Sequence, residues 1–254
     1  MMRLGCPLLT AVLVALSAAS SAWAQSTGAT RVAVELETGP LWLTRNDVRI
    51  PPDTGTDFSL LDLTGRGPDV FFRAQASVQI AKRHGLRLLF APVQTSGTGT
   101  FTAPVRFVDE TFLPSVPTQG TFKFNTYRVT YRYTLHEGKD WRVQIGGAAL
   151  IRDAKIELQQ GGLAAQYTDL GFVPLAYVSA VRRLSERASL VFDLEGLGSP
   201  QGRALDGIAK LDLSVTPKWS LGLGYRTLEG GADVSSVYTF AWLHYGVVSV
   251  GYRF

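Results

Sequence analysis

Long stretches of this sequence alternate, residue by residue, between large apolar side chains and small or polar ones. The last stretch shows the pattern most clearly, because Trp242, Val248 and Val250 fall on one parity while Ser249 and Gly251 fall on the other. A β-strand points successive side chains to opposite faces, so this period predicts strands that separate two different media.

The pattern predicts an all-β fold of about ten strands, with eight as the alternative count. Four connectors are short, such as Lys82–Gly85, and two of the connectors that alternate with them are long, 45–67 and 101–120. Short turns at one end and longer loops at the other are typical of a transmembrane antiparallel up-and-down β-barrel, whose two termini are periplasmic. The expected strands are 31–44, 68–81, 86–100, 121–135, 141–158, 167–182, 187–197, 204–215, 219–228 and 236–254.

Composition removes several other classes of protein. Charged residues make up 18% of the chain, below the roughly 25% of ordinary soluble domains, and the net charge is only +4. Plentiful aromatic residues argue against disorder, and the scattered basic residues argue against a nucleic-acid partner. Outside the N-terminus no apolar run approaches the roughly 18–20 residues of a spanning helix. A soluble secreted barrel is the remaining alternative, but it would need a more highly charged exterior.

The N-terminus has the features of a secretory signal peptide over residues 1–24, which leaves a barrel domain over 25–254. Arg3 supplies the positive start, Leu8–Leu16 the apolar segment and Ala22–Ala24 the cleavage site. Cys6, the one cysteine, is removed with this segment, so the exported chain has no disulfide, no thiol nucleophile and no cysteine-bound metal. We therefore expect no cofactor and no metal.

The C-terminus resembles the terminal signature of the bacterial outer-membrane β-barrel superfamily, in which alternate apolar residues end in a C-terminal phenylalanine. The matching residues here are Val248, Val250, Tyr252 and Phe254. The resemblance implies an outer-membrane location, recognition of these four residues by the assembly machinery, and contact with outer-membrane lipids and lipopolysaccharide. We expect the barrel to insert as a monomer.

If the apolar parity faces lipid, the opposite parity lines the lumen and carries many charges. One interpretation is a set of ion pairs that holds the barrel closed, and the other is a narrow, weakly anion-preferring passage; ten strands lie nearer to the side-chain-filled barrels. The parity that faces inward is ambiguous over 167–182, because Phe172 and Leu175 are both large and apolar but have opposite parities. The expected lumen network comprises Glu35, Glu37, Arg73, Arg87, Arg128, Arg132, Arg142, Arg152, Asp193, Glu195, Lys210, Asp212 and Arg226.

Two features are expected at the outer mouth of the barrel. Residues 57–63 can form one helical turn, capped by Asp57 and ended by Gly65, which would fold over the mouth as a lid. Two tight outer turns would bring together a rim cluster that contacts a ligand. This cluster comprises Arg203, Asp206, Glu229 and Asp233.

The chain has only three histidines, which restricts the catalytic sites that it could form. His84 and His136 fall in periplasmic turns, whereas His244 faces lipid near the outer interface. Some lipid A deacylases carry a lipid-facing His-x-Ser, but Gly246 occupies the serine position here, so the nucleophile is missing. Omptin-type proteases need a histidine at the outer rim, and none of the expected outer loops contains one. The sequence therefore predicts a non-enzymatic barrel with a structural, surface-interaction or narrow-pore role. A lipid-modifying hydrolase that uses His244 is the alternative.

Overall fold

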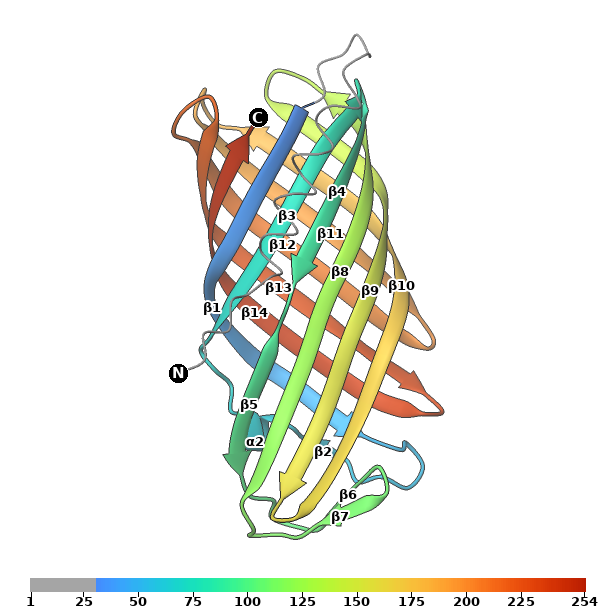
Figure 1. Ribbon diagram of the computed structural model, residues 1–254. Coiled ribbons are helices and arrows are strands. Elements are labelled where there is room, and N and C mark those ends of the chain that lie inside the picture. The colour runs from blue at the N-terminus through green and yellow to red at the C-terminus, as the bar shows by residue number, and fades with distance from the viewer. Residues whose placement is uncertain (1–30) are drawn as a thin grey trace, which may run out of the picture. The chain divides into compact units, whose positions relative to one another are not determined.

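The computed structural model describes residues 31–254, so the expected signal peptide lies outside the described residues. This region forms a closed antiparallel barrel with a wall of ten segments, which we call staves; each stave is one strand, or one strand continued by the next. The last strand, β14 (Val237–Arg253), pairs with the first, β1 (Arg31–Arg49), and closes the barrel (Figure 1). No helix in residues 31–254 is long and apolar enough to cross a membrane. The staves are β1 (Arg31–Arg49), β3 (Asp69–Ala81), β4 (His84–Ala91) continued by β5 (Gln94–Gly99), β8 (Thr118–Glu137), β9 (Trp141–Gln160), β10 (Leu163–Arg183), β11 (Ala188–Ser199), β12 (Gly202–Ser214), β13 (Trp219–Val234) and β14 (Val237–Arg253).

Both ends of the barrel chain lie at one end of the barrel, because Ala33 of β1 pairs with Arg253 of β14. We call this the terminal end and the opposite one the loop end. The connectors at the terminal end are short, as expected. At the loop end, the second long loop contains a hairpin of β6 (Val105–Phe107) and β7 (Glu110–Phe112).

The strand registers refine the expected strands. β10 pairs with β9 without a bulge from Leu163 to Arg182, so Leu175 faces inward and Phe172 outward, which resolves the ambiguous phase. The single strand expected over 86–100 is wrong in one respect, since the chain is interrupted at Pro92 between β4 and β5. Proline has no N–H to contribute to a strand ladder.

The exterior changes from apolar to polar within one or two register positions on three neighbouring staves. The change falls between Tyr127 and Asn125 on β8 and between Ile151 and Asp153 on β9, and these positions are paired across the two strands. On β10 the change falls between Leu170, the register partner of Asp153, and Thr168, which lies two residues nearer the loop end. We call the part with the apolar exterior the membrane section and the part beyond this boundary, at the loop end, the projecting section.

The interior reverses this polarity. In the membrane section the inward side chains include the charged residues described below, whereas in the projecting section they form an apolar core. The expectation that the inward parity is polar therefore applies only to the membrane section. Water surrounds the projecting section, so its apolar side chains turn inward, as they do in soluble proteins. This core includes Phe58, Leu60, Leu63, Phe107, Phe112, Phe122, Ile156 and Leu158, and the same apolar cluster continues along β1 and β14 through Leu41, Leu43, Leu243 and Val247.

Residues 58–66, which we call the plug segment, supply part of this core. The segment contains β2 (Phe58–Ser59) and the single helical turn α2 (Leu61–Thr64), and its Leu60 and Leu63 are buried. The helical turn was expected, but Leu60 precedes it rather than an Asp57 cap. Gly65 ends it with a φ of 74°, which favours glycine.

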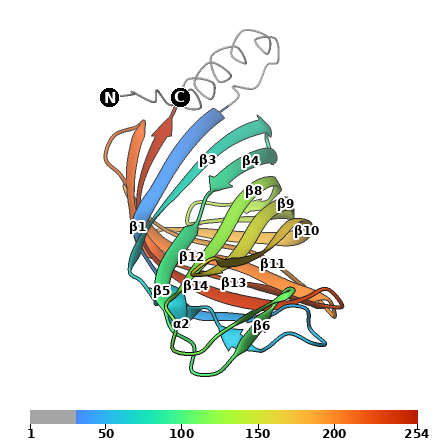
Figure 2. The same ribbon diagram turned by 60° about the horizontal axis from the view of Figure 1, so that its bottom comes forward.

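The plug segment lies in the wall and core of the barrel, so the expectation of a lid over the mouth is wrong. It pairs with β1 through β2, whereas β5 pairs only with β8, so the segment occupies the seam between β1 and β5 (Figure 1). Figure 2 shows α2 beside β5 from the loop end. A Cβ atom on Gly120 would lie 2.9 Å from Cβ of Leu63, so the missing side chain lets the segment approach this closely.

Candidate functional site

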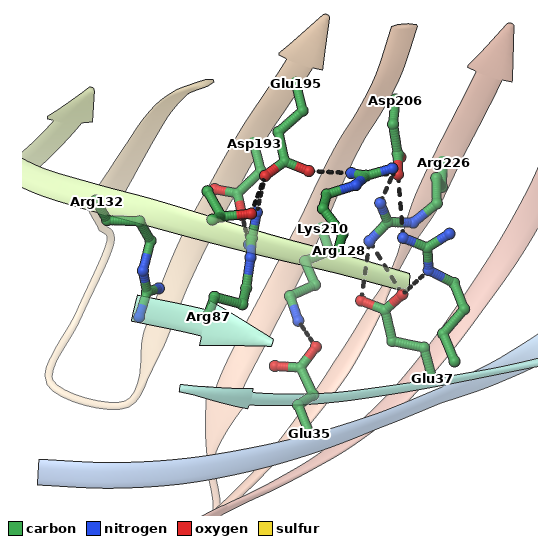
Figure 3. A network of polar contacts seen from close by, with 12 residues as sticks. Glu35, Glu37, Arg87, Arg128, Arg132, Asp193, Glu195, Asp206, Lys210 and Arg226 are labelled. Atoms are coloured by element: carbon green, nitrogen blue, oxygen red, sulfur yellow. Dashed lines mark hydrogen bonds and ion pairs between the residues drawn. The ribbon is translucent and has the colours of Figure 1, made fainter. Parts of the chain in front are cut away.

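The lumen of the membrane section is crossed by a buried network of ion pairs centred on Asp206 of β12 (Figure 3). Its carboxylate accepts hydrogen bonds from Arg226 at 2.6 Å, from Arg73 at 3.0 Å and from Arg128 at 3.0 Å. These arginines come from β13, β3 and β8. One carboxylate thus links staves on opposite sides of the barrel.

Three further carboxylates complete the network. Glu37 accepts hydrogen bonds from the arginine of β13 at 3.0 Å and lies 3.4 Å from that of β3. Glu195 pairs with the arginine of β8, with Arg87 at 3.0 Å, and with the hydroxyl of Thr130 at 2.6 Å. Arg87 also donates to Asp193 at 2.5 Å. Charge-assisted hydrogen bonds of this kind are the strong class of hydrogen bond.

The network is electrically balanced. It contains four carboxylates and four guanidinium groups, and a separate pair between Lys210 and Glu35 adds one charge of each sign. A neutral network has no surplus charge with which to select a permeating anion. Its chemistry is that of a cross-brace, since breaking one member would leave another buried charge without a partner.

Four residues expected in the network lie elsewhere. Arg132, Arg142 and Asp212 line a polar cavity of about 170 Å³ on the terminal side of the network, and within residues 31–254 none of them forms an ion pair. Arg152 pairs instead with Asp169 on the loop side. The charged residues of the lumen thus form two layers. One consists of ion pairs, and the other, nearer the terminal end, contains Arg132, Arg142 and Asp212, which form no ion pair within residues 31–254.

The structure separates the four residues of the expected rim cluster. Arg203 Nε donates to both carboxylate oxygens of Glu229, at 2.8 and 3.0 Å. Asp233 is exposed and has no ion pair in the described part of the chain. Asp206 is not at the rim, because its inward parity on β12 places it in the central network. The expected four-residue cluster is therefore reduced to one pair.

A second cavity of about 370 Å³ lies on the loop side of the network. Its walls include Phe122, Ile156 and Tyr167, with the Arg152–Asp169 pair beside them. Sequence reasoning missed this cavity because it assigned the inward parity to polar residues. One sequence signal could have revealed it: beyond the apolar band the outward-facing residues become polar, so the inward-facing residues there become apolar.

His244 is joined to two other strands on the exterior of the barrel. Its Nε2 lies 2.8 Å from Oγ1 of Thr44 on β1, and its Nδ1 lies 2.5 Å from the hydroxyl of Tyr225 on β13. Thr44 occupies a register shift of β1, and the ring of Trp242 lies 5.3 Å from that of His244. Sequence reasoning missed Thr44, because it precedes His244 by 200 residues.

Three residues of the expected assembly signal lie on the outward parity of β14, and the fourth, Phe254, directly follows the strand. Val248, Val250 and Phe254 are exposed. Tyr252 is partly buried and packs edge-on against Trp219 and Phe254, with ring centroids 4.7 and 4.9 Å apart. This aromatic group marks the terminal edge of the apolar band.

Comparisons with known proteins give the fold but no narrower relationship. No protein-family model matches the sequence, and a search of the curated proteins finds no relative. The outer-membrane protease OmpT from Escherichia coli matches with a TM-score of 0.53 and 8% identity, over 88% of this chain and 97% of that protein. Ail from Yersinia pestis (TM-score 0.39, 14% identity, 89% of this chain and 99% of that one) and the translocator domain of NalP from Neisseria meningitidis (0.41, 16%, 97% of each) are more distant in structure.

The likeness to OmpT shows a shared fold and transfers no activity at this identity. The apolar exterior band and the closed antiparallel wall are the features that a bilayer requires of a spanning sheet. The chain therefore has the fold of a closed ten-stave antiparallel β-barrel with an apolar exterior band, a fold that it shares with OmpT.

Proposed function

We propose that this protein is a non-enzymatic outer-membrane barrel whose lumen is closed to aqueous solutes, with a structural or surface-interaction role. The terminal end faces the periplasm in this proposal, and the projecting section faces the outside. The observation that carries the proposal is the balanced ion-pair network across the lumen. The barrel would be a monomer, inserted by the assembly machinery through Val248, Val250, Tyr252 and Phe254.

Two barriers in series support a closed lumen. The ion-pair network crosses the lumen of the membrane section, and the apolar core with its plug segment fills part of the projecting section. A solute would have to separate buried charges and displace packed apolar side chains. Barrels of eight strands are about filled by side chains, and aqueous channels appear near sixteen, so ten staves are compatible with closure.

Planar-bilayer recording tests this proposal. We expect no conductance from the wild type or from the double variant Arg128→Ala/Arg132→Ala, because the apolar core remains in place in both. A control variant, Arg142→Ala, changes a residue outside the network and should likewise show no conductance. Steady anion-selective conductance in the wild type would replace the closed barrel with the narrow pore.

Arginine–aromatic contacts outside the barrel support lipopolysaccharide as a partner. The guanidinium groups of Arg45 and Arg203 lie 5.0 Å from the ring centre of Phe240, and that of Arg49 lies 4.8 Å from Tyr238. These side chains lie in the projecting section, next to the apolar band. Arg45 and Arg203 also pair with Asp47 and Glu229. Guanidinium groups pair readily with phosphate, so the phosphate groups of lipopolysaccharide would compete for these arginines.

The hydrogen-bonded set of Thr44, His244 and Tyr225 favours a second candidate function, hydrolysis of a lipid acyl ester. His244 Nε2 would take the proton of the Thr44 hydroxyl while Oγ1 attacks the ester carbonyl, and Tyr225 would hold the ring by accepting the Nδ1–H bond. The ring would then protonate the departing alcohol, and water would hydrolyse the acyl-threonine. A β-bulge at Thr44 fits this role, since bulges often re-aim side chains at sites of chemistry.

Mass spectrometry of lipid A separates the two functions. Cells that express the wild type, His244→Ala or Thr44→Val are compared with cells that lack the gene. For the non-enzymatic barrel, all four lipid profiles are the same. Loss of an acyl chain in the wild type alone would establish the hydrolase.

A further inference from the structure

One strand of the wall has an edge without a partner. β10 pairs with β9 from Leu163 to Arg182, but with β11 only from Ala176 to Arg183. β8, β9 and β10 extend farther toward the loop end than the β11–β12 hairpin does (Figure 1). Among residues 31–254 no strand pairs with the β11 side of β10 between Leu163 and Leu175.

Part of this open edge lies in the membrane section. Leu170 and Phe172 are on the apolar side of the exterior boundary, and they are 76% and 69% exposed. Hydrocarbon offers no water to free peptide groups, so a sheet edge in contact with lipid tails is unfavourable. Pro174 removes one N–H from this stretch, but the other residues retain theirs. The remaining edge groups need an occupant with hydrogen-bonding atoms.

The loop-side cavity opens at the same edge. Its lining combines inward side chains, such as Phe122 and Ile156, with Phe172 and Pro174, which face outward. The cavity therefore extends from the apolar core to the outer surface, past the free edge of β10. Its volume of about 370 Å³ is in the range of small-molecule sites, and its aromatic and aliphatic walls suit a hydrocarbon chain.

Charged side chains stand at the mouth of this cavity. Three basic residues, Arg152, Lys155 and Arg203, and one acidic residue, Asp169, contribute to the lining. Each basic residue also has an acidic partner: Arg152 pairs with Asp169, Lys155 contacts Glu157 on its own strand at 2.6 Å, and Arg203 pairs with Glu229. The group is therefore balanced in charge, and what it offers to a phosphate-bearing head beside the apolar interior is its guanidinium and ammonium N–H donors.

We propose that this notch is a lateral binding site for a phosphate-bearing membrane lipid. One acyl chain enters the cavity against Phe122, Ile156 and Tyr167, while the phosphate remains at the basic residues. Ester and phosphate oxygens then accept hydrogen bonds from the edge of β10. In the orientation proposed above, the lipid comes from the outer leaflet. The site does not depend on whether the lumen conducts, so the bilayer recordings and the lipid-binding experiment can fail separately.

Native mass spectrometry of the refolded mature chain tests the site. The probes are phosphatidylglycerol, lipid A and a phosphate-free alkyl glycoside, each added to the protein in detergent. We expect one retained molecule of a phosphate-bearing lipid, at about tenfold higher occupancy than the glycoside, equivalent to about 1.4 kcal/mol. The preference between phosphatidylglycerol and lipid A identifies the source of the lipid. Equal retention of the glycoside would overturn the assignment of the basic residues to a phosphate.

A cavity-filling variant and a matched control localise the binding. Ala154→Phe places a ring in the cavity and should reduce lipid occupancy about tenfold, whereas Ala149→Phe, on the outward face of the same strand, should leave it unchanged. Heat-modifiable migration on gels verifies that each variant folds. If Ala154→Phe does not fold, Ala232→Phe fills the cavity from β13. Absence of a retained lipid, or equal retention in the cavity variant and the control, overturns the proposal.

Discussion

At the scale of single residues, Asp206 has the greatest structural consequence. It is buried and receives hydrogen bonds from three arginines that precede or follow it by 133, 78 and 20 residues. The sequence predicted Asp206 in the rim cluster, and no local pattern identified its partners. The rim placement is wrong because position along a strand does not show height in a tilted barrel.

Replacement of Asp206 by alanine should leave three guanidinium groups with too few carboxylates. We expect a loss of about 3–5 kcal/mol in the free energy of unfolding, the usual result when one partner of a buried ion pair is removed. Urea unfolding of the refolded protein in lipid vesicles measures it. Asp233→Ala, at an exposed site, should change stability by less than about 0.5 kcal/mol. Similar values for the two variants would show that the network does not brace the barrel.

At the scale of elements, the plug segment is held differently on its two sides. Toward β1 it forms hydrogen bonds, including Leu60 N–H to Asn46 O at 2.8 Å and Leu43 N–H to Arg66 O at 3.0 Å. Toward β5 it relies on packing against Gly97 and Gly99 of that strand and against Gly120 of the neighbouring β8. The sequence predicted the helical turn, but the path of the segment into the wall depends on an open seam that the sequence does not reveal.

A side chain at Gly120 should displace the plug segment. In Gly120→Val the new Cβ would lie 2.9 Å from Leu63 Cβ, and such overpacking typically costs about 1–3 kcal/mol. Trypsin should then cleave faster after the exposed Arg66, which limited proteolysis with mass spectrometry can follow. Gly162→Val, where a Cβ meets no atom within 4 Å, is the control. Equal cleavage rates would mean that packing at Gly120 does not retain the segment.

At the scale of the whole molecule, the barrel combines two kinds of protein along one axis. The membrane section is apolar outside and charged inside, while the projecting section is polar outside and apolar inside. Each polarity follows from the medium outside the wall at that height. The low overall charge therefore reflects both an exterior in contact with lipid and an interior filled with apolar side chains beyond it.

Insertion of the whole barrel should depend on its last residue. We expect deletion of Phe254 to lower the amount of protein in the outer membrane severalfold, because the terminal signature is proposed to guide assembly. Cell fractionation and heat-modifiable migration on gels measure inserted and folded protein. Leu213→Ala, at another exposed apolar position, should insert normally. Full insertion without Phe254 would contradict the assembly role of the C-terminus.

The sequence by itself predicted an up-and-down barrel of about ten strands, with eight as the alternative, and the inward parity of most charges, because alternation is a local property of an extended backbone. Only the tertiary structure decided which charges meet, where the apolar core begins, and that Thr44 lies beside His244. Those features depend on the stagger of distant strands and the path of the first loop. Local periodicity contains no record of either, because contacts between staves join residues that are far apart in the chain.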